Sequence, residues 1–60
     1  MKTYSELVGL ARTAAGNAHG AANKQVAAAL WQMAREYQAE AGKVGDPPDI
    51  GDPPTLIGKA

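Results

Sequence analysis

Residues 16–23 read GNAHGAAN, and this short stretch decides how the 60-residue chain is organised. Glycine and asparagine are poor helix formers, and Asn23 is well suited to cap a helix that follows it. The apolar pattern also changes phase here, because the heptad that starts at Tyr4 would place polar residues such as Gln25 on its seam if it continued. We therefore expect a turn near residues 19–23 that separates two helices.

The first expected helix covers residues 4–18. Thr3 and Glu6 match the T-x-x-E capping box, in which the two side chains satisfy free backbone N–H groups at a helix start. Apolar residues then recur at the spacing of one helix face, namely Tyr4, Leu7, Val8, Ala11, Ala14, Ala15 and Ala18. The pattern predicts an amphipathic helix with Thr3 as its N-cap.

The second expected helix covers residues 24–41, between Asn23 as N-cap and Gly42, a residue favoured just past a helix end. Its apolar stripe consists of Val26, Leu30, Met33, Tyr37 and Ala41. A connection this short favours an antiparallel hairpin whose two apolar faces meet. The predicted fold class is therefore all-α, with the hairpin as one unit spanning residues 1–42.

The remaining residues, 43–60, form a tail in which the phrase Gly-Asp-Pro-Pro occurs at 45–48 and again at 51–54. Proline pairs favour polyproline II geometry with three residues per turn, so a period of six is two turns. Sorting by threes gives an apolar edge of Val44, Pro47, Ile50, Pro53 and Leu56, and an acidic edge of Asp46, Asp49 and Asp52. We expect an amphipathic extended strap, with a solvated disordered tail as the alternative.

The composition indicates that this hairpin needs further contacts. Apolar residues make up 45% of the chain, but many are alanine, so few large side chains are available for a core. With no cysteine and one histidine, the chain cannot be stabilised by a disulfide or by a structural metal site. We therefore expect the hairpin to be stabilised by oligomerisation or by docking on a larger subunit.

Charge and hydropathy exclude some partners. Six basic and six acidic side chains give a formal net charge of zero, which lacks the basic footprint of a nucleic-acid-binding protein. No apolar run is long enough for a membrane span or a signal-peptide core. We expect a cytoplasmic protein that binds neither nucleic acid nor membranes.

Candidate catalytic groups are sparse. His19 has no neighbouring ligand and is expected to be a turn residue, while Glu36 and Glu40 lie one helical turn apart on a solvated face. Aspartates three residues apart on a polyproline edge are about 9 Å from each other, too far to share one ion. We therefore expect no enzymatic activity, cofactor or metal.

Trp31 lies beside the apolar stripe rather than on it. Three interpretations are open: a cation–π pair with Arg35, a cover for the folded-back tail, or an anchor at an interface, where Trp and Arg are enriched. Each of them gives Trp31 more than a surface role.

The predicted function is that of a non-catalytic accessory protein, which associates through its hairpin and docks its C-terminal strap on a protein partner. The alternative is a regulatory binder, such as an antitoxin or phage-type inhibitor, whose tail occupies a groove of a larger protein. The residues expected at the protein interface are Leu30, Trp31, Arg35, Tyr37, Val44, Ile50, Leu56 and Ile57.

Overall fold

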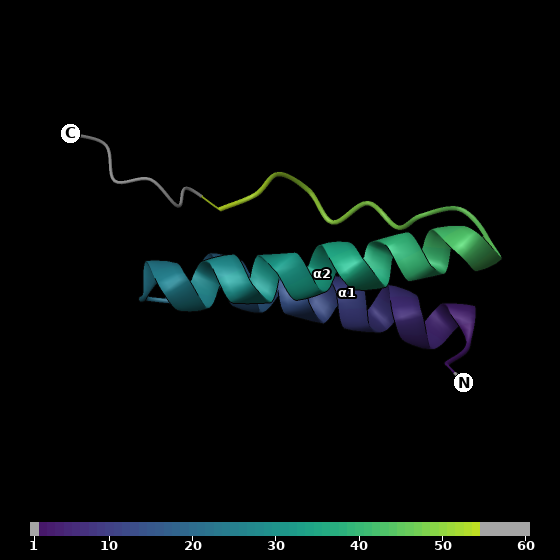
Figure 1. Ribbon diagram of the computed structural model, residues 1–60, viewed down its shortest axis with the longest axis horizontal. Helices are drawn as coiled ribbons and strands as arrows, with labels where there is room; N and C mark the ends of the chain where they lie inside the picture. Colours follow the sequence, from purple (N-terminus) through teal and green to yellow (C-terminus); the bar gives the residue numbers. More distant parts are fainter. Residues whose placement is uncertain (1, 55–60) are drawn as a thin grey trace.

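The computed structural model describes residues 2–54, which form two helices and no strand. Helix α1 spans Tyr4–Gly20, and α2 spans Lys24–Val44. The two helices pack side by side in opposite directions, and the chain after α2 turns back along them (Figure 1). The predicted all-α hairpin is confirmed.

Local signals set the start of each helix. The Thr3 hydroxyl accepts a hydrogen bond from the Glu6 backbone N–H, and the Glu6 carboxylate accepts one from the Thr3 N–H, so the predicted capping box is present. The Asn23 side chain accepts hydrogen bonds from the N–H groups of Gln25 and Val26. The connection of residues 21–23 is shorter than the predicted turn at 19–23, because α1 continues two residues past its predicted end at Ala18 and keeps His19 in its last turn.

Helix α2 continues past its predicted end at Ala41 and stops at Val44. Gly45 is the C-cap, and its N–H donates to the Ala41 carbonyl at 2.9 Å. Gly42 stays helical with the Pro47 ring above it, where an added Cβ would lie 3.5 Å from the Pro47 Cβ. The prediction is wrong here because Gly42 stays within the helix and Gly45 takes the capping position.

Small side chains dominate the contact between the helices. The buried apolar residues are Leu7, Ala11, Ala14, Ala15 and Ala18 of α1, and Ala27, Trp31, Ala34 and Ala41 of α2. For α1 this agrees with the predicted face, although Tyr4 remains 37% exposed and Val8 is half-buried. The alanines allow the two backbones to approach closely, so the core is narrow and holds one large aromatic side chain.

The predicted apolar stripe of α2 is wrong in part. Val26 and Met33 are 49% and 43% exposed, whereas the neighbouring stripe of Ala27, Trp31 and Ala34 is buried. An alanine-lined α1 offers a shallow surface, which a facing stripe of alanines fits more closely than one of larger side chains. Leu30 and Ala41 are the residues of the predicted stripe that retain a place at the core, Leu30 half-buried against the core cluster and Ala41 fully buried.

The chain after α2 forms a third layer over the hairpin. We call residues 45–54 the strap, which runs back along the helices toward the connection between them (Figure 1). Among the described residues neither helix is long and apolar enough to cross a membrane.

Candidate protein-interaction surfaces

The strap is tied to the hairpin by side-chain donors that reach its backbone carbonyls. The Tyr4 hydroxyl donates to the Asp46 carbonyl at 2.6 Å, and the Gln38 Nε2 donates to the Pro48 carbonyl at 2.8 Å. The His19 Nε2 lies 2.7 Å from the Asp52 carbonyl. A carbonyl oxygen only accepts, so the His19 Nε2 carries the proton of this hydrogen bond.

Two of these hydrogen bonds match the repeat in the sequence. Asp46 and Asp52 occupy the same position in the two Gly-Asp-Pro-Pro phrases, and their carbonyls meet aromatic side chains at the two ends of α1, Tyr4 and His19. Fifteen residues of helix rise about 22 Å. The two phrases are therefore held near opposite ends of α1, by Tyr4 and by His19.

Apolar contacts fill the space between these hydrogen bonds. Pro48 is buried, and the half-buried Ile50 packs on a cluster that contains Ala14, Ala15, Ala18, Trp31 and Ala34. The rings of His19 and Trp31 meet edge to face, with centroids 5.9 Å apart and an interplanar angle of 88°. We define the strap groove as the face formed by Tyr4, Ala15, His19, Trp31 and Gln38.

Each glycine that opens a phrase has its own structural reason. An added Cβ at Gly45 would lie 3.1 Å from the Tyr4 Cε1, a tight contact that the Tyr4 ring would have to shift to relieve. Gly51 has a φ of +81°, a region that residues with a Cβ rarely adopt. The Gly51 N–H also donates to the Asp49 carboxylate at 2.9 Å, which closes a local turn.

The strap departs from the predicted polyproline edges. The φ of Gly51 lies far from the polyproline value of about −75°, so the run is interrupted there. Pro47 and Pro53 of the predicted apolar edge are exposed, whereas Pro48 is buried and Pro54 half-buried. The prediction assumed three residues per turn throughout, and the turn at Gly51 removes that regularity.

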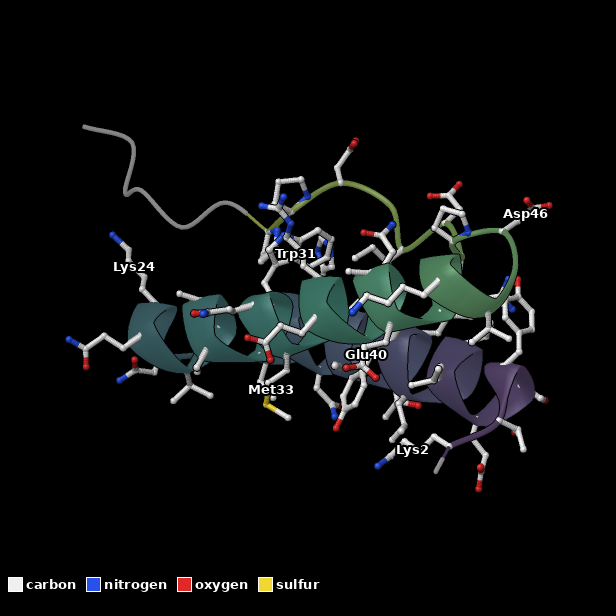
Figure 2. All side chains as sticks on the ribbon, turned by 45° about the vertical axis from the view of Figure 1, so that its right-hand side comes forward. Lys2, Lys24, Trp31, Met33, Glu40 and Asp46 are labelled. Atoms are coloured by element: carbon white, nitrogen blue, oxygen red, sulfur yellow. The ribbon has the colours of Figure 1, made fainter. Side chains whose placement is uncertain are left out.

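A second surface lies on the other side of α2. Val26, Leu30, Met33, Tyr37 and Val44 follow one another at helical spacing, and we call them the α2 apolar face. Val26, Met33 and Val44 are well exposed, with Val44 at 65%. Trp31 points toward the strap, whereas Met33 points away from it on the opposite side of the helix (Figure 2).

The residues predicted at an interface thus fall into separate groups. Trp31 is 9% exposed and belongs to the core cluster of the chain itself, on which Ile50 packs. Leu30, Tyr37 and Val44 belong to the α2 apolar face, with Val44 in the last turn of α2 rather than in the tail. Arg35 is exposed and lines a shallow hollow beside Trp31. The remaining two, Leu56 and Ile57, lie outside the described residues.

Sequence reasoning missed the donors that hold the strap. Tyr4 was assigned to the apolar face of α1, His19 to the turn, and Gln38 to no role. A single polar side chain on a helix does not indicate which distant segment it will contact, so the sequence carries no clear signal for these three donors.

The described residues do not assemble a metal site, since residues 2–54 contain no group of three or more His, Cys, Asp or Glu side chains close enough to hold an ion. Three open hollows on the described surface lie beside the strap and α2.

Comparison with protein families, with curated proteins and with solved structures finds no match to this chain.

Proposed function

We propose that this protein is a non-enzymatic accessory protein that associates with a protein partner through the α2 apolar face. The observation that carries the proposal is the exposure of Val26, Met33 and Val44 in a chain with few large apolar side chains. The strap covers the opposite side of the hairpin, so the chain itself shields one face and leaves this one open. Contiguous exposed apolar surface is a mark of interaction sites.

The spacing of the face favours a helix as the contacting element. Val26, Leu30, Met33 and Tyr37 follow one another at intervals of four, three and four residues, the interval pattern of a helix–helix seam. Exposed charged residues beside the face, Glu36, Glu40 and Lys43, provide a polar rim around it. A partner helix, from a second copy or from a larger subunit, completes the helical packing.

The end of the strap supplies the second contact in this proposal. Pro53 and Pro54 line a hollow with Ala21, Ala22 and Lys24, at the connection between the helices. Pro54, the last described residue, therefore lies at the closed end of the hairpin, where the two helices are connected. We propose that Leu56 and Ile57 contact the same partner.

The experiment compares two double substitutions on one helix. Val26→Asp with Met33→Asp places two charges on the α2 apolar face, and the control, Gln25→Asp with Gln32→Asp, places two at exposed polar positions one residue earlier. Sedimentation velocity at micromolar concentration and affinity purification of the tagged chain measure association. We expect the face variant to lose at least tenfold in association and the control to retain it. Equal behaviour of both variants, or a wild-type chain that is monomeric and captures no protein, contradicts the proposal.

A further inference from the structure

The strap groove has the chemistry of a peptide-binding site. The groove supplies three hydrogen-bond donors, from Tyr4, His19 and Gln38, and carbonyl oxygens of the strap accept these hydrogen bonds. Proline has no N–H, so a segment with two proline pairs offers mainly acceptors and a preformed backbone. Aromatic side chains combined with donors to carbonyls are the usual means of recognising proline-rich segments.

The groove binds the phrase at two points rather than one. The Asp carbonyl of each phrase meets one aromatic donor of α1, and between them Pro48 and Ile50 occupy the centre. Main-chain carbonyls are common to every residue, so the two hydrogen bonds read the spacing of the backbone, while the apolar contacts of Pro48 and Ile50 read the side chains.

The contacts that attach the strap to the helices are of a type that opens locally, while the helices stay folded. Beyond Gly45, no main-chain hydrogen bond joins the described part of the strap to the helices. Two of its side-chain hydrogen bonds, those of Tyr4 and His19, are exposed to water. Segments with exposed hydrogen bonds and few buried contacts open at the lowest free-energy cost in a protein.

We propose that the strap groove also accepts the strap of a second copy, so that two molecules exchange residues 45–54 reciprocally. A second copy carries the one segment that the groove is already shown to fit. Reciprocal exchange restores the same hydrogen bonds and apolar contacts in both molecules and closes a symmetric dimer. The only segment that must change course is the one around Gly45, where the chain reverses after α2. This surface is separate from the α2 apolar face.

The first test strains the strap at its junction, where Gly45 lies against one residue of the groove, Tyr4. In Gly45→Val the new side chain crowds the Tyr4 ring, because a Cβ alone would already lie 3.1 Å from the Tyr4 Cε1. The control is Gly9→Val, where nothing lies within 4 Å of an added Cβ. Both are made with Val26→Asp and Met33→Asp, which removes association through the α2 apolar face. We expect the dimer fraction at 100 micromolar, measured by sedimentation velocity, to rise at least threefold for Gly45→Val and to stay unchanged for the control.

The second test supplies the strap in trans. A synthetic peptide of residues 44–54 is titrated into the full-length Gly45→Val chain and into Ile50→Asp, and the emission of Trp31, the single tryptophan, is recorded. We expect a saturable blue shift with this peptide and none with the same peptide carrying Ile50→Asp. Absence of a shift in both chains, together with an unchanged dimer fraction, overturns the proposal. Peptide binding without dimer formation overturns exchange between copies and leaves the groove to the strap of the same chain.

Discussion

Trp31 shows how one residue depends on three segments of the chain. His19 of α1 meets it edge to face, Ala34 lies one turn further along α2, and Ile50 of the strap packs on the cluster to which Trp31 belongs. The small side chains of Ala14, Ala15 and Ala18 make room for the indole. Its burial to 9% exposure is therefore a result of the whole assembly rather than of its position on the helix.

A single hydroxyl tests the first phrase of the repeat. Tyr4→Phe removes the donor to the Asp46 carbonyl and keeps the ring, so we expect a loss of about 1 kcal/mol in the free energy of unfolding. Tyr37→Phe is the matched control, because the Tyr37 hydroxyl makes no hydrogen bond among residues 2–54. Chemical denaturation followed by circular dichroism measures both. Equal losses would show that the hydrogen bond to the strap contributes nothing.

Substitution of two different glycines by alanine should change the stability of the chain in opposite directions. Gly51→Ala forces a Cβ into a φ of +81° and should cost about 1 kcal/mol. Gly16→Ala lies within α1 with open space around it and should stabilise the chain by about 0.5–1 kcal/mol. Thermal unfolding of the two variants should shift in opposite directions from the wild type. A shift in the same direction contradicts the assigned backbone role of Gly51.

At the scale of elements, α2 carries two adjacent stripes with different uses. The stripe of Ala27, Trp31, Ala34 and Ala41 faces α1 and the strap, and the α2 apolar face beside it stays open. Because the spacing of both stripes is helical, either could have formed the seam. The alanine stripe does so because it matches a facing helix that is itself lined with alanine.

Enlarging one alanine tests the closeness of this seam. Ala34 is fully buried, so Ala34→Leu forces the helices apart and should cost about 1–3 kcal/mol. The exposed Ala29 on the same helix provides the control, and Ala29→Leu should change stability by less than about 0.5 kcal/mol. Urea denaturation distinguishes the two outcomes. A tolerated Ala34→Leu would mean that the helices are not held at close approach.

At the scale of the whole molecule, the strap converts a two-helix hairpin into a three-layer structure. It buries Pro48 and packs Ile50 on the core cluster, which a chain of this size cannot complete with two alanine-rich helices alone. Burial of such apolar side chains contributes about 1–2 kcal/mol each before the cost of ordering the segment. The prolines lower that cost because they restrict the unfolded chain.

Two truncations separate the strap from the residues after it. A chain that ends at Val44 should expose Trp31, so its emission should move to longer wavelength and its thermal midpoint should fall. A chain that ends at Pro54 keeps every described contact of the strap and should match the full-length protein in both measurements. If the shorter chain retains the Trp31 emission of the full-length protein, the strap does not cover the core.

The sequence by itself determined the helices. The capping box at Thr3 and Glu6, the Asn23 cap and the change of phase between the helices are signals within a few residues of each other, and the structure follows all three. Backbone capping is local chemistry, so it can be predicted without knowledge of the rest of the chain. The antiparallel pairing followed because the connection is too short for another arrangement.

Only the tertiary structure decided which surfaces of those helices are used. The choice between the two stripes of α2 depends on the shape of α1 and on the cover that the strap gives to Trp31, and both lie outside the local sequence. The roles of Tyr4 and His19 depend on contacts with residues 42 and 33 positions away along the chain. Periodicity identifies the apolar positions of a helix, but it does not determine which of two apolar stripes is buried. In this fold the stripe rich in small side chains packs closely against α1, so it is buried in place of the larger residues of the predicted stripe.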